Sequence, residues 1–273
     1  MFVLDHAFFR STLLDDDRIV HGFSTRRGGV STLAHTASMN VAEGRGDPDE
    51  TVHANIDLLA RAVSGGTLSA SSVICAPQIH SANIRRVTAA DAGTGVNRPS
   101  LGEGDGFLTS DAGILLMVRV ADCVPILFSA VREDGTPLVA AVHAGWRGTA
   151  AGIAPKAVEM LLSDGAELSS IRCAVGQSIH VCCYEVGEDF TAAVADAQGK
   201  SFADTHIRYR DGQLFADLPG MNRELLRGAG LTDEQIDISP FCTACDPTLF
   251  HSHRASHGLR GTMGALIGIR AHQ

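Results

Sequence analysis

The chain has 273 residues, of which 45% are hydrophobic and 19% are charged, and its formal net charge at pH 7 is −9. This composition is typical of a globular protein with one large or two small domains. The negative charge argues against a basic face that binds nucleic acid. No stretch reaches the roughly 18 consecutive apolar residues that a membrane helix needs. We therefore expect neither nucleic acid nor a membrane among its partners.

Location is predicted from the N-terminus and from the cysteines. The first 18 residues are acidic and aromatic and lack the basic segment of a signal peptide. The seven cysteines are an odd number and are scattered along the chain, which argues against a framework of disulfides. We expect a cytoplasmic protein with reduced thiols.

The first quarter of the chain predicts two strands and a helix. Residues 2–9 and 19–24 are apolar segments on either side of an acidic turn, and a Gly-Gly loop follows at 26–31. Acidic residues at 47–50 begin a helix whose apolar residues recur at helical spacing until Gly65 and Gly66 end it.

The rest of the chain alternates irregularly between strands and helices. Strands are predicted at 73–78, 83–87, 106–109, 114–120, 124–131, 138–142, 171–175, 214–217, 236–239 and 263–269. Helices are predicted at 153–162, 186–197 and 219–229, and 88–104 is a loop. Continuous apolar strands in this order predict an α+β fold, a layered α/β arrangement of mixed β-sheets flanked by helices. No linker interrupts the chain, so we expect one domain over residues 1–273.

Three apolar segments are each followed by a residue that binds soft metals. These residues are His80, Cys123 and His143. A cysteine or histidine alone after a strand is more often a core or hydrogen-bonding residue. Three such residues at strand ends, where the sites of α/β proteins gather, favour a shared metal. Two imidazoles and a thiolate leave the fourth position of a tetrahedral zinc open to water or substrate, which is the catalytic arrangement.

The segment after His143 predicts an anion site. Gly145 and Gly148 allow close approach to a backbone that turns from a strand into a helix, and Arg147 adds a positive charge. The alternative is an ordinary turn with an arginine at the surface.

A second group of possible ligands lies near the C-terminus. Cys242 and Cys245 are followed by His251, His253 and His257, but their spacing is too short for a ββα zinc finger. The adjacent pair Cys182 and Cys183 matches no common ligand spacing, and we interpret it as a feature of the core and of a turn.

These motifs together resemble the YfiH family. The most specific segments are Ala121–Pro125 and His143–Gly148, and Gln78–His80 supports them. Further segments that resemble the family are Phe23–Ser31, Met39–Val41, Asn55, Asp105–Thr109, Cys183–Gly187, Cys242–Thr243 and Phe250–Arg254. Members of this family were called multicopper polyphenol oxidases or laccase-domain proteins and are now described as purine nucleoside phosphorylases. Two departures from the family pattern, at Gln177 and Thr262, affect the expected pocket; Arg260 is adjacent to the second.

The resemblance implies a YfiH-like fold related to a deamidating toxin domain. It implies zinc on His80, Cys123 and His143, with copper as the other candidate metal. It also implies phosphorolysis of adenosine, inosine, guanosine or methylthioadenosine, together with adenosine deamination. The expected partners are a purine nucleoside and inorganic phosphate, and monomer and homodimer both stay open.

Site residues follow from the matched motifs. Besides the three metal ligands, Asp122 and Glu185 are candidate catalytic carboxylates that orient a ligand or carry a proton. The candidate substrate- and phosphate-binding residues are Arg26, Asn40, Gly145, Arg147, Gly148, Ser252 and Arg254.

Three other functions compete with the phosphorylase. A copper-dependent polyphenol oxidase would use the same soft ligands, although a laccase needs several coppers on many histidines. A metal-free cysteine amidohydrolase would use Cys123 as the nucleophile and His143 as its base. A binding module would close the zinc with a fourth protein ligand. Metal content and coordination distinguish the four.

Overall fold

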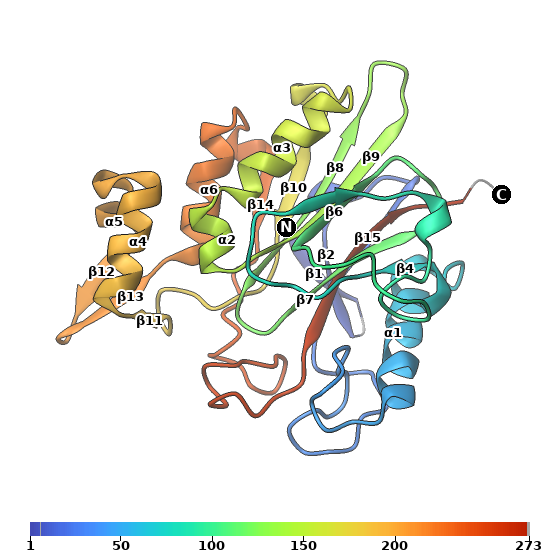
Figure 1. Cartoon of the computed structure of the whole chain (residues 1–273), viewed down its shortest axis with the longest axis horizontal. Helices are drawn as coiled ribbons and strands as arrows, with labels where there is room; N and C mark the ends of the chain where they lie inside the picture. Colours follow the sequence, from blue (N-terminus) through green and yellow to red (C-terminus); the bar gives the residue numbers. More distant parts are fainter. Residues whose placement is uncertain (6, 272–273) are drawn as a thin grey trace.

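A computed structural model of the chain describes residues 1–5 and 7–271. Two six-stranded sheets lie face to face, and helices pack on the outer face of each sheet (Figure 1). The predicted fold class, mixed sheets flanked by helices, is confirmed. In the part of the chain that the structure describes, no helix is long and apolar enough to cross a membrane.

The first sheet has the strand order β1-β2-β3-β15-β7-β4. Its strands are β1 (Phe2–Asp5), β2 (Phe8–Ser11), β3 (Ile19–Ser24), β15 (Met263–Ile269), β7 (Leu115–Val120) and β4 (Val73–Ile74). Only β4 runs parallel to its neighbour, and the other pairs are antiparallel. Helix α1 (Asp49–Ser64) covers the outer face; it begins with two acidic residues and ends at Gly65 in the left-handed conformation.

The second sheet has the order β14-β10-β8-β9-β6-β5. Its strands are β14 (Ile236–Ile238), β10 (Arg172–Val175), β8 (Val124–Val131), β9 (Pro137–Ala144), β6 (Gly106–Thr109) and β5 (Ile84–Arg86). The edge strands β14 and β5 run parallel to their neighbours, and the inner pairs are antiparallel. Helices α2 (Trp146–Ala150), α3 (Ile153–Ser163) and α6 (Leu218–Gly228) contribute to the core on the outer face of this sheet.

A smaller unit projects from the second sheet, at the left of Figure 1. It consists of helices α4 (Glu188–Gln198) and α5 (Lys200–His206) and a three-stranded sheet of order β11-β13-β12. These strands are β11 (Glu185–Val186), β13 (Gln213–Ala216) and β12 (Ile207–Arg210).

Both faces of the central strands are buried, which explains their continuous apolar sequences. In β9, Leu138, Ala140 and Val142 point to the core under the helices, whereas Val139 and Ala141 point to the core between the sheets. Successive side chains of a strand alternate between its faces, so a strand packed on both sides needs apolar residues throughout.

Most of the predicted elements are confirmed, and four strands have the predicted bounds: 19–24, 106–109, 124–131 and 263–269. The predicted strand at 73–78 is wrong beyond Ile74. There the amide side chain of Gln78 hydrogen-bonds the backbone N–H and C=O of Arg119 at 2.7 and 2.8 Å, in place of a strand ladder. The helix predicted from 186 begins instead at Glu188, because Val186 pairs with Leu214 in the small sheet. Helix α5 and strand β12 had no sequence prediction.

Candidate metal centre and its cavity

The structure brings His80, Cys123 and His143 together. One ligand atom from each lies within 4.8 Å of the others, and Nε2 of His80 is 3.8 Å from the Cys123 sulfur. The two imidazole rings meet edge to face with their centroids 4.8 Å apart. His80 is exposed, Cys123 is half-buried and His143 is buried. The group is therefore anchored in the core on one side and open on the other.

Strand pairing explains why residues distant in sequence meet here. Cys123 lies in the turn between β7 and β8, and His143 lies near the end of β9. In the β8–β9 hairpin Val124 pairs with Ala144, which places the cysteine beside the residues that end β9. His143 was expected after its strand, but it is part of β9, because the ladder continues to Ala144. His80 comes from the loop that follows β4, where it has a positive φ of 61°.

Gly145 leaves room for the three ligands. A Cβ at this position would lie 2.6 Å from Cδ2 of His80, 3.3 Å from the sulfur of Cys123 and 3.4 Å from Cε1 of His143. Real Cβ atoms do not approach other atoms to 2.6 Å, so the cluster requires a glycine here. Gly148 is similarly constrained, because its Cβ would lie 2.8 Å from the backbone oxygen of Ser81.

Asp105 positions both histidines. Its fully buried carboxylate accepts a 2.8 Å hydrogen bond from Nδ1 of His143, and it accepts bonds from the backbone N–H of His80 at 3.0 Å and of Ser81 at 2.7 Å. Asp105 was not among the predicted site residues. A signal was present in the sequence, because an aspartate directly precedes the buried strand that begins at Gly106.

Charges alternate along Asp105, His143 and Cys123. Burial raises the pKa of Asp105, but hydrogen bonds from His143 and Ser81 outweigh this and lower it to about 2. Burial also opposes the charge on His143, yet Cys123 and Asp105 raise its pKa to about 9. Burial likewise raises the pKa of Cys123, and the charge and hydrogen bond of His143, with help from His80, lower it to about 6. Without a metal, the arrangement favours a thiolate beside an imidazolium.

The donor set fits a divalent metal of borderline softness. A thiolate and two imidazoles are ligands of zinc and of copper. A carboxylate that holds the far nitrogen of a histidine is the usual second layer of such a site and fixes the orientation of the ring. The space that Gly145 leaves open lies against all three ligands.

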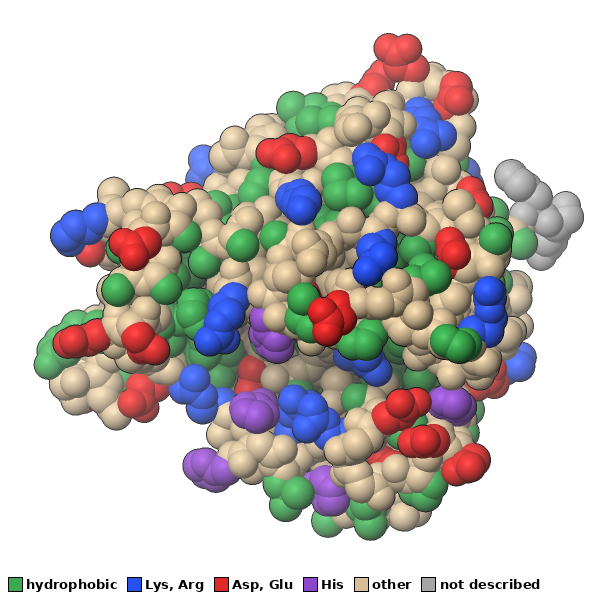
Figure 2. All heavy atoms as spheres, viewed as in Figure 1, with side chains coloured by type: hydrophobic (Ala, Val, Ile, Leu, Met, Phe, Trp, Pro, Cys, Tyr) green, Lys and Arg blue, Asp and Glu red, His purple; other side chains and the backbone are tan. Residues whose placement is uncertain are grey.

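A cavity of about 320 Å³ adjoins the three ligands. It is lined by His80, Cys123 and His143 and by three arginines, Arg45, Arg119 and Arg260; the other lining residues are Ala42, Glu43, Pro77, Gln78, Val120, Ala121 and Thr262. On the face shown in Figure 2, arginine and histidine side chains gather around a hollow between the sheets and the loops at the bottom of the view. This basic hollow is notable in a protein whose net charge is −9.

Two of these arginines have unsatisfied hydrogen-bond donors. The Nε atoms of Arg45 and Arg260 are buried and have no hydrogen-bond partner. Burial, with the charge of nearby Arg45, lowers the pKa of Arg260 to about 10. Arg119 donates to the backbone oxygen of Ala76 at 3.0 Å. Guanidinium groups brought together in this way are suited to an anion.

Similarity to known proteins identifies the family of the chain. Residues 20–270 match the family described as multi-copper polyphenol oxidoreductase laccase. The chain belongs to this family. It is 36% identical over 258 residues to a protein of Geobacillus stearothermophilus named purine nucleoside phosphorylase YlmD, with 92% of this chain and 90% of that protein covered.

Solved structures of the same family have the same fold. A Bacillus licheniformis hypothetical protein YfiH superposes with a TM-score of 0.88 at 30% identity, covering 98% of this chain and 99% of that one. YlmD of Geobacillus stearothermophilus superposes with a TM-score of 0.86 at 33% identity, covering 99% of each chain. The predicted resemblance to the YfiH family is thereby confirmed.

Two predicted binding residues of this family member are occupied by structural hydrogen bonds. The guanidinium of Arg26 donates to the backbone oxygens of Ala37, Pro247 and Ala34 at 2.9, 2.8 and 3.2 Å. The fully buried side chain of Asn40 bonds Asp47 and the backbone of residues 42 and 262. Neither residue lines the cavity.

The remaining predicted binding residues make different contacts, and none is among the residues that line the cavity. Gly145 and Gly148 pack against the metal centre, as described above. Arg147 is exposed and lies over the ring of Trp146 at 4.2 Å. The hydroxyl of Ser252 accepts a bond from the backbone N–H of Ala255, and Arg254 donates to the backbone oxygen of Glu185 at 2.6 Å.

The two predicted carboxylates differ in their surroundings. Asp122 is buried and has a φ of 94°; its carboxylate accepts bonds from the hydroxyl of Thr243 at 2.6 Å and from the backbone N–H of Arg254 at 2.7 Å. Glu185 is an exposed residue of β11. Glu43, which had no prediction, is the one carboxylate among the residues that line the cavity.

The two departures from the family pattern have separate places. Thr262 lines the cavity, and its hydroxyl accepts a bond from Arg260. Gln177 is buried and donates to the backbone oxygen of Ser24 at 2.8 Å. Of the two departures, only Gln177 lies away from the residues that line the cavity.

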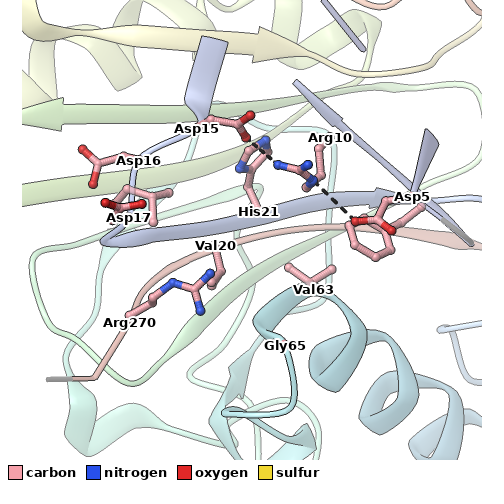
Figure 3. Close-up of a pocket in the computed structure, with 12 residues that line it drawn as sticks. Asp5, Arg10, Asp15, Asp16, Asp17, Val20, His21, Val63, Gly65 and Arg270 are labelled. Atoms are coloured by element: carbon pink, nitrogen blue, oxygen red, sulfur yellow. Dashed lines mark hydrogen bonds and ion pairs between the residues drawn. The ribbon is translucent and has the colours of Figure 1, made fainter. Parts of the chain in front are cut away.

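A larger cavity, of about 650 Å³, lies elsewhere, among the N-terminal strands and the end of α1. Figure 3 shows its lining of aspartates around Arg10 and His21. Arg10 pairs with Asp15 at 2.7 Å, and Asp16 pairs with Arg18 at 2.8 Å. The cavity shares no lining residue with the metal centre, and its carboxylates do not suit a phosphate or another anion.

Proposed function

We propose that this chain is a metal-dependent purine nucleoside phosphorylase. The observation that carries the proposal is the cavity beside His80, Cys123 and His143, which is also lined by three arginines from separate parts of the chain. The relatives named purine nucleoside phosphorylase support the same reaction class. The cavity volume is at the lower end of the range for small-molecule sites, which suits a nucleoside and phosphate rather than a polymer.

Arg45, Arg119 and Arg260 are the phosphate-binding residues of this proposal. All three line the cavity beside the metal centre, and guanidinium groups are suited to charge-assisted hydrogen bonds with the oxygens of a phosphate. The mutual repulsion of the arginines also falls when a dianion lies between them. We assign phosphate to these residues rather than to Arg26 and Arg147, because neither of those lines the cavity.

Zinc on His80, Cys123 and His143 is part of the proposal, and when bound it supplies a Lewis acid at the edge of the cavity. Asp105 fixes the ring of His143, and Gly145 keeps the space in front of the three side chains open. In phosphorolysis an oxygen of phosphate bonds C1′ of the ribose, the bond from C1′ to the purine breaks, and a proton reaches the departing base. Arg45 and Arg260 hold the phosphate nucleophile in place, and positioning of this kind removes a large part of the activation free energy of a reaction between two bound molecules.

Glu43 is our candidate for the proton carrier. It lines the cavity, whereas the carboxylate of Asp122 is held by Thr243 and Arg254. We assign Asp122 a positioning role next to Cys123, and we regard Glu185, which does not line the cavity, as the weaker candidate. Adenosine deamination belongs to the proposal as a second activity of the same centre.

One observation favours a second candidate, the metal-free cysteine amidohydrolase. Cys123, His143 and Asp105 form a thiol, base and carboxylate series of the kind that activates a nucleophile. A copper polyphenol oxidase has less support. Among the described residues, the two groups of potential metal ligands contain no more than two histidines each.

The experiment is product chromatography with inosine or adenosine, with and without inorganic phosphate. We expect free base and ribose 1-phosphate only when phosphate is present, and inosine from adenosine under both conditions. Cys123→Ala should lose both the bound zinc and the release of base. Base release at the same rate without phosphate, or intact turnover by zinc-free Cys123→Ala protein, would contradict the proposal.

A further inference from the structure

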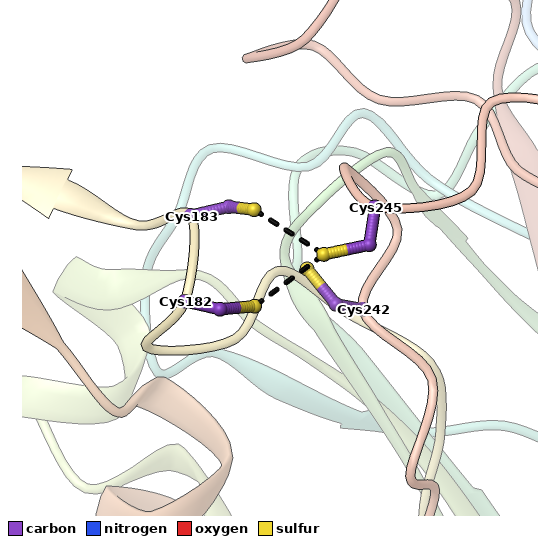
Figure 4. A group of neighbouring side chains, drawn as sticks. All are labelled: Cys182, Cys183, Cys242 and Cys245. Carbon is purple, nitrogen blue, oxygen red and sulfur yellow. Dashed lines mark hydrogen bonds between the residues drawn. The ribbon is translucent and has the colours of Figure 1, made fainter.

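Four cysteines form a second cluster, outside the centre described above. Cys182 and Cys183 lie in the loop before β11, and Cys242 and Cys245 lie in the loop after β14. Figure 4 shows the four sulfur atoms turned toward one another from the two loops. All four lie within 4.8 Å of each other, and the Cys245 sulfur is 3.5 Å from that of Cys182 and 3.4 Å from that of Cys183.

These separations are those of a tetrahedral sulfur site. Four sulfurs at about 2.3 Å from a zinc ion lie about 3.8 Å from one another. The separations of 3.5 and 3.4 Å are slightly shorter than this, and no pair of the four exceeds 4.8 Å. They are much longer than the roughly 2.05 Å of a disulfide, and all four cysteines are free. Cys245 is also almost equally distant from two sulfurs, which a single disulfide would not require.

The backbone around Cys242 is arranged to support a thiolate. Its sulfur accepts a bond from the backbone N–H of His180 at 3.4 Å. A backbone N–H directed at a cysteine sulfur suits a metal-bound thiolate, because it disperses the negative charge of the sulfur.

A cation would also remove an electrostatic conflict. Four thiolates at these distances repel one another, and four neutral thiols in a polar loop gain little from being packed together. A divalent ion compensates two of the charges, and the guanidinium of Arg210, which donates to the backbone oxygen of Cys182 at 3.1 Å, adds positive charge. Metal binding releases the protons of the thiols.

We propose that Cys182, Cys183, Cys242 and Cys245 bind one structural zinc ion. Four protein ligands close the coordination sphere, so this ion has no position for substrate. The first centre differs, because its three ligands leave one position open. The inference is independent of the proposed phosphorylase reaction.

The position of the cluster defines what the ion would stabilise. The loop that carries Cys242 continues to Thr243, whose hydroxyl holds Asp122, the neighbour of Cys123. The loop that carries Cys183 continues to Tyr184, over whose ring Arg254 lies at 5.2 Å. The ion would therefore fix two loops that adjoin the first centre without taking part in the reaction.

Metal analysis of protein purified under reductant tests the proposal. We expect about two zinc ions per chain in the wild type and about one in Cys182→Ser/Cys245→Ser. Cys123→Ala should also retain about one, and a variant with all three substitutions almost none. Cys75→Ser is the matched control: it removes a buried thiol outside both groups, keeps a donor to the backbone oxygen of Gly95, and should keep the wild-type zinc.

Cobalt provides a second readout that does not depend on activity. Co²⁺ bound by four thiolates gives intense charge-transfer absorption, which should persist in Cys123→Ala and fall in Cys182→Ser/Cys245→Ser to the much weaker absorption of the single Cys123 thiolate. The double variant should also unfold at a lower temperature than the control. The proposal is overturned if the double variant keeps the full zinc content, if the wild type contains iron and sulfide there, or if reduced wild-type protein has no more zinc than its first centre accounts for.

Discussion

Asp105 holds Nδ1 of His143 through a hydrogen bond of 2.8 Å between two buried side chains, and this leaves Nε2 as the nitrogen for a metal. The same carboxylate also binds the backbone of His80. One residue thus sets the orientation of two of the three ligands. Loss of its charge should affect the centre more than loss of any surface carboxylate.

Asp105→Asn should weaken metal binding by about 10- to 100-fold, because an amide holds the imidazole less strongly than a carboxylate does. Competition with a chromophoric chelator measures the affinity. Asp134→Asn is the matched control, since Asp134 lies in the turn at the far end of the same β8–β9 hairpin. Equal affinities of the two variants would show that Asp105 does not position the ligands.

Gly145→Ala should abolish metal binding and turnover while the chain still folds. The added methyl would lie 2.6 Å from the ring of His80, in the space between the three ligands. Zinc content and the release of base from inosine measure the effect. In Gly228→Ala, the control, the methyl at the end of α6 has no atom within 4 Å beyond its chain neighbours and the backbone of its own helix, and both quantities should stay at the wild-type level. Normal zinc content in Gly145→Ala would rule out the proposed geometry.

Arg260→Ala should raise the KM for phosphate by roughly tenfold to a hundredfold, as the loss of a charge-assisted hydrogen bond of about 1.5–3 kcal/mol implies. The KM for the nucleoside should change much less. Arg61→Ala is the control, since Arg61 is an exposed residue of α1 paired with Asp57 at 2.6 Å. The same assay on Arg147→Ala tests whether Arg147 or Arg260 binds phosphate. A larger increase in the KM for phosphate in Arg147→Ala than in Arg260→Ala would favour Arg147, the residue predicted from the sequence.

Two of the three candidate metal ligands, Cys123 and His143, could be predicted because each lies at or next to the end of a long buried strand. Cys123 follows an apolar run that has no other reason to end in Asp-Cys, and His143 precedes a Gly-rich turn. The layered fold was predictable for the same reason, since its strands are continuous apolar segments. These features are local in sequence, so a single chain displays them.

The arginines of the cavity could not be found in this way. Arg45 and Arg260 lie in irregular loops, and they line one cavity with Arg119 only because β3, β15 and β7 lie side by side and end at the same end of the first sheet. The four-cysteine cluster could not be predicted from the sequence for the same reason. Cys182 and Cys245 are 63 residues apart, and each pair looks incomplete until the two loops are brought together.

Metal-free protein should show an unusually acidic Cys123. The pKa of its thiol falls from an ordinary value near 9 to about 6, and that of His143 rises from 6.5 to about 9. The thiolate therefore contributes stability that is fully present above about pH 9 and is lost as the pH falls through 6. The imidazolium contributes stability that is fully present below pH 6.5 and is lost as the pH rises through 9. Between about pH 6 and 9 both charges coexist.

Alkylation by iodoacetamide, followed by peptide mass spectrometry, measures this titration at Cys123 alone. After removal of metal, the rate should reach half of its maximum near pH 6 in the wild type. In His143→Gln the midpoint should move toward 9, because the principal charge that stabilises the thiolate is lost. Cys75 serves as an internal reference, since burial raises the pKa of its thiol and it should react slowly throughout. A midpoint near 9 in both proteins would mean that His143 does not activate the thiol, and it would remove the main support for the metal-free hydrolase.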